Sequence, residues 1–283
     1  MNRLGLILEG GGMRGVYTAG VLDCMADYKL WTDGIIGVSA GATHGCNFRS
    51  RQRGRNYRID VEHSQNPKFM GVRSLLTTGD YFGADFCYRY LPDELDPFDY
   101  KTFQRAPSEF YAVCTDLETG SAVYEQIEDL KDKMDYLRAS ASMPLFSKIV
   151  EVDGKKLMDG GIADSIPVRK FTEMGYAKNI VILTQPADYR KKKNKLIPLL
   201  KLVYRRYPLF LKALEMRHEV YNDSLDLVSE KEKSGELFVF RPEEIDISRV
   251  ERNPEKLKAV YHAAYRQAES RLRSLKEFME LGY

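Results

Sequence analysis

Short apolar runs alternate along the chain with stretches of helical periodicity. The first run, Leu4–Leu8, predicts a buried strand, and the stretch Val16–Asp27 that follows has apolar residues at helical spacing. Further apolar or β-branched runs predict strands at 35–36, 109–114, 122–124, 147–152, 155–158, 179–184 and 237–240. This alternation predicts an α/β fold of three layers, in which helices cover both faces of a mainly parallel central sheet.

The chain ends in a stretch that predicts one long helix, residues 254–280. Asn253 suits the N-cap and Pro254 suits the first turn. The apolar side chains of this stretch fall on one stripe, made of Leu257, Val260, Tyr261, Ala264, Ala268, Leu272 and Leu275. Such a stripe is typical of a helix that packs on a core.

Residues Gly37–Gly41 read Gly-Val-Ser-Ala-Gly and match the G-x-S-x-G nucleophile elbow. The apolar pair Ile35 and Ile36 precedes them, and small residues typical of a tightly packed helix follow. This motif exposes a strained serine hydroxyl where a strand turns sharply into a helix. We therefore predict that Ser39 is a nucleophile, placed by an elbow after the second strand, with Gly37 and Gly41 permitting the turn.

A glycine-rich loop follows the first predicted strand. Gly10, Gly11 and Gly12 stand at the start of a helical stretch, where backbone N–H groups can point at an anion. Beside a serine nucleophile, such donors form an oxyanion hole, and losing one donor costs on the order of 10²–10³ in rate. The spacing Gly10-x-Gly12-x-x-Gly15 also fits a dinucleotide-binding loop, but the second strand ends without the acidic residue that would bind a ribose.

The base that would activate Ser39 is sought among histidines and carboxylates. The four histidines are His44, His63, His218 and His262, and each is more typical of a packing or surface position than of a catalytic one. Asp159 instead ends a predicted strand and precedes Gly160 and Gly161, which permit close backbone approach. Asp-Gly is also a common turn dipeptide, so this motif alone favours a simple turn.

Taken together, the three motifs resemble the patatin-like phospholipase family, most closely its bacterial branch. That family has a G-G-G-x-R/K-G loop, a G-x-S-x-G elbow and a D-G-G/A turn, which residues 10–15, 37–41 and 159–161 match in the same order. The stretches 138–144 and 161–168 are also similar to the family, and the resemblance covers roughly residues 3–185.

The resemblance implies a Ser-Asp catalytic dyad, in which Ser39 forms an acyl-enzyme and Asp159 is the base. An ordinary Asp has a pKa of about 3.9, which is poorly suited to this role. We therefore expect Asp159 to lie in an apolar cleft that raises its pKa. The resemblance also assigns Gly10, Gly11, Gly12, Arg14 and Gly15 to the oxyanion-hole loop; Arg14 is expected to brace it or to attract an anionic substrate.

Composition and charge agree with an ordinary globular enzyme. Hydrophobic residues make up 43% and charged residues 30%, and the formal net charge is +2. The four cysteines show no metal or disulfide spacing, which favours free thiols in a reducing compartment. No cofactor or metal is expected, and no nucleic-acid-binding module accompanies the basic residues. With no signal peptide and no span of ~18 apolar residues, a cytoplasmic protein that touches the inner face of the membrane peripherally is predicted.

A basic and apolar segment, residues 186–220, follows the expected catalytic core of residues 1–185. It belongs to a C-terminal extension, residues 186–283, together with the late strand and the terminal helix. Basic and apolar residues interleaved in this way are typical of a segment that lies on anionic lipid, although a buried helical lid gives the same pattern. Pro198 and Pro208 should divide the segment into short helical pieces.

The sequence thus predicts a serine acyl hydrolase that cleaves ester-linked acyl chains of phospholipids or related lipids without a cofactor. Two alternatives stay open at this point. One is a non-catalytic lipid- or acyl-binding module, which would have no need of Ser39, Asp159 and the glycine loop together. The other is an esterase that acts on soluble acyl esters.

Overall fold

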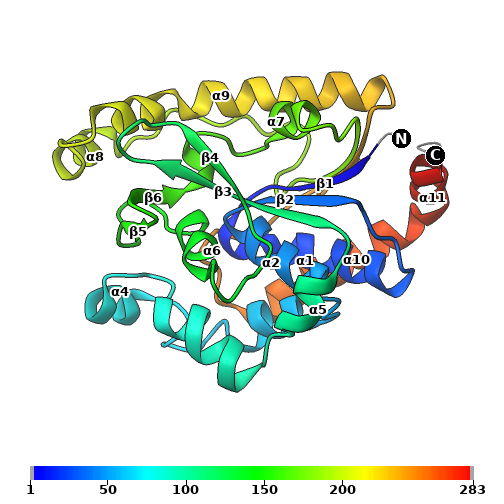
Figure 1. The fold of residues 1–283 in the computed structure, drawn as a ribbon, viewed down its shortest axis with the longest axis horizontal. Coiled ribbons are helices and arrows are strands. Elements are labelled where there is room, and N and C mark those ends of the chain that lie inside the picture. The colour runs from blue at the N-terminus through cyan, green and yellow to red at the C-terminus, as the bar shows by residue number, and fades with distance from the viewer. Residues whose placement is uncertain (1–2, 281–283) are drawn as a thin grey trace.

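The middle layer of the computed structural model, which describes residues 3–280, is an eight-stranded sheet (Figure 1). Its order is β5-β6-β3-β2-β1-β7-β8, with β4 paired to β3. The five strands β3, β2, β1, β7 and β8 are parallel, and β4, β5 and β6 are antiparallel. The strands are β1 (Leu4–Leu8), β2 (Gly34–Val38), β3 (Glu109–Asp116), β4 (Ala122–Gln126), β5 (Val150–Val152), β6 (Lys155–Asp159), β7 (Lys178–Ile182) and β8 (Leu237–Phe240).

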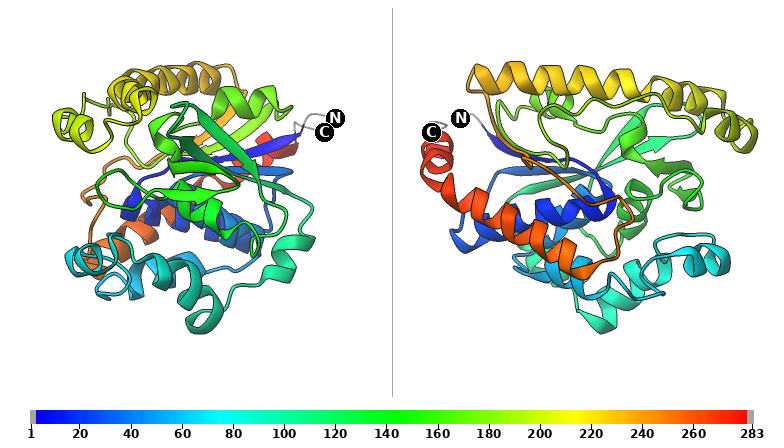
Figure 2. Two further views of the ribbon diagram at one scale, coloured as in Figure 1. Left: turned by 60° about the vertical axis from the view of Figure 1, so that its left-hand side comes forward. Right: turned by 180° about the vertical axis from the view of Figure 1, so that it is seen from behind.

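Helices cover both faces of the sheet, which confirms the predicted three-layer fold. Figures 1 and 2 show α7 and α9 over one face and α1, α2, α6 and α10 over the other. The helices are α1 (Val16–Asp27), α2 (Ala40–Arg49), α3 (Arg55–Tyr57), α4 (Val72–Thr78), α5 (Tyr100–Arg105), α6 (Met134–Ser140), α7 (Val168–Glu173), α8 (Ile197–Val203), α9 (Pro208–Lys233), α10 (Pro254–Ser270) and α11 (Leu272–Glu280). Short 3₁₀ turns, η1 (Gly12–Gly15) and η4 (Gly160–Ile162), and two π-helical segments, η2 (Arg58–Glu62) and η3 (Phe86–Leu95), complete the list.

Alternate residues of the central strands fill two separate apolar layers. On β1, Leu6 and Leu8 pack among side chains of α1 and α2, whereas Ile7 packs among side chains of α7 and α9. All three are fully buried. A central strand covered on both faces is therefore apolar at every position, and each such side chain contributes about 1.5–3 kcal/mol of burial.

The C-terminal third of the chain adds to this sheet and to the helical layer. The predicted strand at 237–240 is confirmed, because β8 extends the sheet beyond β7. Helix α10 lies against α1 so closely that a Cβ atom on Gly20 would stand 2.4 Å from the carbonyl oxygen of Tyr261. The structure thus places β8 and α10 within the core, while the domain boundary after residue 185 stays a prediction.

Two predictions for the C-terminal region are corrected by the structure. The helix expected over 254–280 is interrupted at Arg271, which lies between α10 and α11. The Arg271 guanidinium donates to the carbonyl oxygen of Val239 and covers the ring of Phe238, which ties the break to the edge strand. The segment does break before Pro208, as predicted, but the piece that follows is the 26-residue α9 and not a short helix; proline suits its first position because the missing N–H needs no partner there.

Residues 186–220 form an irregular stretch, the short α8 and the first half of α9. Helix α8 lies at the same end of the molecule as α4, beyond the edge of the sheet formed by β5 and β6 (Figure 1). No helix among the described residues combines the length and the apolar character that crossing a membrane requires.

Candidate active site

Ser39 occupies a sharp turn between β2 and α2. Its backbone angles are φ 55° and ψ −123°, a conformation that costs a non-glycine residue on the order of 1–3 kcal/mol. The two flanking positions have no room for a side chain. A Cβ on Gly37 would lie 2.5 Å from the Ala42 nitrogen, and one on Gly41 would lie 2.3 Å from the Leu8 carbonyl oxygen. The structure thus has the expected elbow, with Ser39 at its apex and 7% exposed.

The register of the sheet brings Asp159 beside the elbow. Val38, the last residue of β2, pairs with Val113 of β3, and the next residue of β3, Cys114, pairs with Asp159. Strand β6 runs back antiparallel to β3 and ends at this position. Ser39 and Asp159 therefore stand on either side of β3 at the carboxyl edge of the parallel strands, although 119 residues separate them in sequence.

The Asp159 carboxylate is 4% exposed and contacts several groups that favour its charged form. Its Oδ1 accepts from the Gly161 N–H at 2.7 Å, and the Ser39 hydroxyl and the Arg217 guanidinium face it. Burial outweighs these groups and raises the pKa of Asp159 above its ordinary value. The direction of this shift is the one that the sequence predicted.

The surroundings of Asp159 are nevertheless not the apolar cleft that we expected. The cavity beside Asp159 and Ser39 is also lined by Lys191, Arg217 and Arg249. The apolar surface lies elsewhere, in a second cavity that reaches Ser39 but not Asp159. The expectation was wrong because it considered only residues near Asp159 in sequence, whereas the cationic groups come from the C-terminal third of the chain.

The glycine loop lies directly against the elbow. A Cβ on Gly10 would stand 2.7 Å from the Ser39 Cβ, and Gly12, at φ 56°, would meet the Arg249 carbonyl oxygen at 2.5 Å. Among residues 3–280, no acceptor takes the N–H groups of Gly10, Gly11 or Gly12, whereas the Met13 N–H donates to Arg249. Three free backbone donors thus lie beside the serine.

The other two residues of the loop have different surroundings. The Arg14 N–H donates to the Gly11 carbonyl at 3.3 Å, and its guanidinium, whose pKa burial lowers, faces the Gln185 side-chain oxygen. A Cβ on Gly15 would contact the ring of His44 at 2.5 Å, so this glycine permits the close packing of α1 on α2. Roles for Arg14 and Gly15 in an oxyanion hole stay predictions.

Two serines that the sequence did not single out hold the site together. The Ser39 N–H donates to the Ser140 hydroxyl at 2.9 Å, and the Asp159 N–H donates to the Ser142 carbonyl oxygen at 2.9 Å. Both serines lie at the end of α6 and are buried. This one turn of chain therefore fixes the backbone of Ser39 and of Asp159 at the same time. Both serines lie in the stretch 138–144, which is similar to the family. That similarity was the one sequence feature that could have pointed to them.

Glu9 is a third residue that the sequence analysis missed. Its carboxylate accepts from the Thr184 N–H and from the Tyr221 hydroxyl, both at 2.6 Å. The side chain is 3% exposed and comes directly before the glycine loop. Glu9 thus connects the ends of β1 and β7 to α9. The sequence feature that could have pointed to Glu9 is its position between an apolar strand and three glycines.

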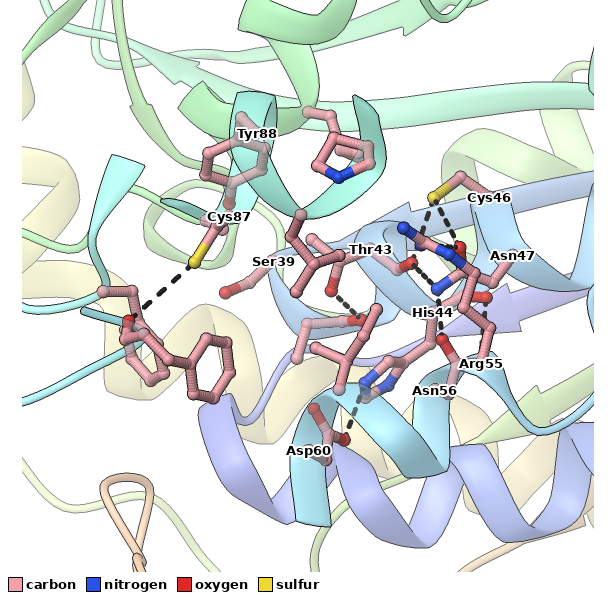
Figure 3. Close-up of a pocket in the computed structure, with 18 of the residues that line it drawn as sticks. Ser39, Thr43, His44, Cys46, Asn47, Arg55, Asn56, Asp60, Cys87 and Tyr88 are labelled. Carbon is pink, nitrogen blue, oxygen red and sulfur yellow. Dashed lines mark hydrogen bonds and ion pairs between the residues drawn. The ribbon is translucent and has the colours of Figure 1, made fainter. Parts of the chain in front are cut away.

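A cavity of about 120 Å³ is lined by Ser39 but not by Asp159. Figure 3 shows Ser39, Thr43, Cys87 and Tyr88 around it, with the His44–Asp60 pair also in its wall. Its lining is largely apolar and includes Met13, Phe69, Phe82, Leu91, Pro92, Phe98, Leu130, Met134, Leu137 and Met143. Such a surface suits a hydrocarbon chain.

His44, Cys46 and Cys87 line the apolar cavity beside Ser39, and His218 lines a second cavity that Asp159 also lines. His44 is buried in α2 and pairs with Asp60 at 2.9 Å, whereas His262 is exposed on α10. His218 pairs with Glu219, its neighbour on α9. All four cysteines are free thiols. Among the described residues, no group of His, Cys, Asp and Glu has the arrangement of a metal site.

Comparisons with known proteins match this chain in two parts. A family model described as Patatin-like phospholipase matches residues 6–172, a span that includes Ser39 and Asp159. A second model, described as a domain of unknown function (DUF6363), matches residues 207–280.

Several curated relatives are similar to part of this chain. Uncharacterized protein YjjU of Escherichia coli is 29% identical over 192 residues, which are 66% of this chain and 53% of YjjU. Uncharacterized NTE family protein Rv1063c of Mycobacterium tuberculosis is 30% identical over 173 residues, 59% of this chain and 44% of the relative. Lysophospholipase NTE1 of Saccharomyces cerevisiae is 25% identical over 201 residues, 66% of this chain and 11% of the relative. The chain thus matches about half the length of the first two relatives.

Among solved structures, VipD from Legionella pneumophila aligns with a TM-score of 0.49 at 12% identity. The alignment covers 97% of this chain and 67% of that chain.

Proposed function

The chain belongs to the patatin-like phospholipase family, and on that premise we propose that it is a serine acyl hydrolase that cleaves ester-linked acyl chains of phospholipids or related lipids. The observation that supports the proposal is that Ser39, the Asp159 carboxylate and the glycine loop line one cavity, with the Ser39 hydroxyl facing Asp159. These are the nucleophile, base and oxyanion donors that acyl transfer requires.

In the proposed reaction, the Ser39 oxygen attacks the ester carbonyl while Asp159 accepts the hydroxyl proton. The carbonyl oxygen becomes an anion that the N–H groups of Gly10, Gly11 and Gly12 stabilise. The ester bond then breaks, the leaving alcohol takes the proton from Asp159, and the acyl group remains on Ser39. A water molecule gives a proton to Asp159 and attacks the acyl carbon. The bond between that carbon and the Ser39 oxygen then breaks, Asp159 passes the proton to this oxygen, and the fatty acid leaves.

Burial of Asp159 makes a carboxylate suitable as this base. A raised pKa makes the carboxylate a stronger proton acceptor than an exposed Asp. The Arg217 charge and the Gly161 N–H favour the charged form of Asp159 and so limit the rise of its pKa. The acyl chain is placed in the apolar cavity beside Ser39.

The substrate class is tested by hydrolysis of a diacyl phospholipid, a lysophospholipid and the soluble ester p-nitrophenyl butyrate. Wild type should release fatty acid from at least one lipid, and Ser39→Ala and Asp159→Asn should lose this activity while staying folded. Activity on the soluble ester alone would favour an esterase. No activity on any substrate, with an unreactive Ser39, would favour an acyl-binding module.

We further propose that the end of the molecule bearing α8 docks on anionic membrane. Leu199, Leu202 and Val203 of α8 are exposed, and so are the neighbouring Lys192, Lys193 and Lys195. Apolar side chains beside lysines suit a surface of anionic lipid. Across the same end of the molecule, α4 exposes Val72 and Leu76.

Vesicle binding tests this docking. The change of Lys192, Lys193 and Lys195 to Glu should abolish sedimentation with phosphatidylcholine vesicles that contain phosphatidylserine. As a matched control, Lys258, Arg266 and Lys276, exposed on α10 and α11, are changed to Glu. Equal loss in both variants, or in neither, would contradict a docking surface at α8.

A further inference from the structure

Three cationic side chains converge beside Ser39 and Asp159 from separate parts of the C-terminal third. Lys191 precedes α8, Arg217 lies on α9, and Arg249 lies in the loop between β8 and α10. All three line the small cavity that contains Ser39 and Asp159, and all three line the adjoining cavity of about 380 Å³. Because the two cavities share these walls, the cationic groups surround the space next to the nucleophile.

These basic groups lie close enough together to act on one another. No carboxylate of the described residues lies within 4.0 Å of Lys191, Arg217 or Arg249. The groups act on one another: burial and then the charge of Arg249 lower the pKa of Arg217, and burial, Arg217 and Arg249 lower the pKa of Lys191 to about 6. Glu9 and Asp159 are the acids that face them, while Arg14 adds a further positive charge. Such a cluster is stabilised when an anion enters.

Contacts of the side chain or of the backbone position each of these three residues. Arg217 Nε donates to the Gly161 carbonyl oxygen at 2.5 Å. This bond uses Nε alone, so the two terminal nitrogens of the guanidinium can bind a ligand. Lys191 Nζ lies 3.9 Å from the centroid of the Tyr221 ring. The Arg249 backbone carbonyl accepts from the Met13 N–H at 3.0 Å and so anchors this arginine on the glycine loop.

We propose that Lys191, Arg217 and Arg249 bind the phosphate group of an acyl ester while its acyl chain lies in the apolar cavity that Ser39 also lines. This inference rests on the proposed function and narrows it to phosphate-bearing lipids. Met143 lines both the apolar and the cationic cavities, so a ligand passing Ser39 reaches each of them. Guanidinium and ammonium groups are the ordinary ligands of phosphate oxygens.

The site also gives the C-terminal region a role. Arg217 and Arg249 fall within residues 207–280, the span of the domain of unknown function, and Lys191 precedes it; none of the three lies in the matched span 6–172. The first part of the chain thus supplies the nucleophile, base and oxyanion donors. The second part supplies the cations that select the head group.

Paired substrates test this assignment. Lysophosphatidic acid and a monoacylglycerol with the same chain differ only in the phosphate group. Wild type should prefer the phosphate substrate by about tenfold or more in kcat/KM, mainly through KM, since charge-assisted hydrogen bonds form in the ground state. The double variant Lys191→Gln, Arg249→Gln should lose about tenfold of this ratio. The matched variant Lys258→Gln, Arg266→Gln, exposed on α10, should retain it.

Calorimetric titration of the Ser39→Ala protein separates the sources of phosphate and does not depend on turnover. Lysophosphatidic acid should bind more tightly than inorganic phosphate, and the double variant should weaken both. Binding should also take up protons near neutral pH, because a bound anion raises the pKa of Lys191. Equal binding of inorganic phosphate and lipid would contradict the lipid assignment, and absence of both would overturn the site.

The two proposals fail differently. Equal kcat/KM on the two substrates would contradict phosphate recognition while the acyl hydrolase proposal stands. Absence of all hydrolysis, with phosphate binding intact, would contradict the hydrolase and retain an anion site.

Discussion

The backbone N–H of Ser39 donates a 2.9 Å hydrogen bond to the hydroxyl of Ser140 at the end of α6. Two residues further on, the Ser142 carbonyl accepts from the backbone of Asp159. The relative position of the two proposed catalytic residues therefore depends on a short turn that belongs to neither motif. The strained elbow is held from α6 as well as from its own glycines.

Ser140→Ala is expected to weaken this arrangement. The change leaves the Ser39 N–H buried without its acceptor, which costs about 1–3 kcal/mol. We predict a lower Tm and a slower reaction of Ser39 with a fluorophosphonate. Ser270→Ala, at an exposed position where the hydroxyl bonds only within α10, serves as the control. Equal Tm and labelling rates in the two variants would contradict the role of Ser140 in holding the backbone of Ser39.

Gly12→Ala should be more damaging than another glycine change at a similar backbone angle. Gly12 has φ 56°, and the added Cβ would lie 2.5 Å from the Arg249 carbonyl oxygen. Gly235 has φ 78° and no atom within 4 Å of the same position. Gly235→Ala should therefore cost about 1 kcal/mol for the backbone angle alone. Gly12→Ala should cost more and also lose acyl hydrolase activity, as denaturant unfolding and rate measurements would reveal.

The acid limb of the pH–rate profile should report Asp159. The base acts only when ionised, so kcat/KM should fall as the pH decreases through its raised pKa. The Arg217 charge lowers this pKa, and Arg217→Gln should therefore move the acid limb to higher pH. A neutral soluble ester is the substrate, because it makes no use of the phosphate site. An unchanged limb in Arg217→Gln would indicate that another group titrates.

The histidines are expected to be dispensable for the reaction. His262→Ala removes an exposed side chain of α10, and His218→Ala removes one that pairs only with Glu219 and its own helix. Both variants should keep most of the wild-type labelling rate with a fluorophosphonate. Loss of labelling in either folded variant would replace the proposed Asp159 base with a histidine.

Much of the fold was predictable because the strands of the core are apolar and short. β1, β2 and β7 each stand out as apolar runs between helical stretches. The G-x-S-x-G motif at Gly37–Gly41 also predicts a strand before it and a helix after it. The structure differed where tertiary contacts decided the outcome. Arg271 interrupts the last helix because its guanidinium is bound to β8, a partner that helical periodicity does not reveal.

The site was predictable only as far as it lies in contiguous motifs. Ser39, Asp159 and the glycine loop each have a local pattern. The cationic wall has none, because Lys191, Arg217 and Arg249 are distant in sequence and resemble ordinary surface charges there. Only folding shows that they share a cavity with Ser39. The expected apolar surroundings of Asp159 were wrong for the same reason.

The central claim is that Ser39 is an activated nucleophile with Asp159 as its base. It is tested most directly by reaction with a fluorophosphonate followed by intact-mass analysis of wild type, Ser39→Ala and Asp159→Asn. We predict one adduct on wild type, none on Ser39→Ala and a greatly slowed reaction in Asp159→Asn. No adduct on folded wild type in the presence of detergent or vesicles, or equal labelling of wild type and Asp159→Asn, would contradict the account.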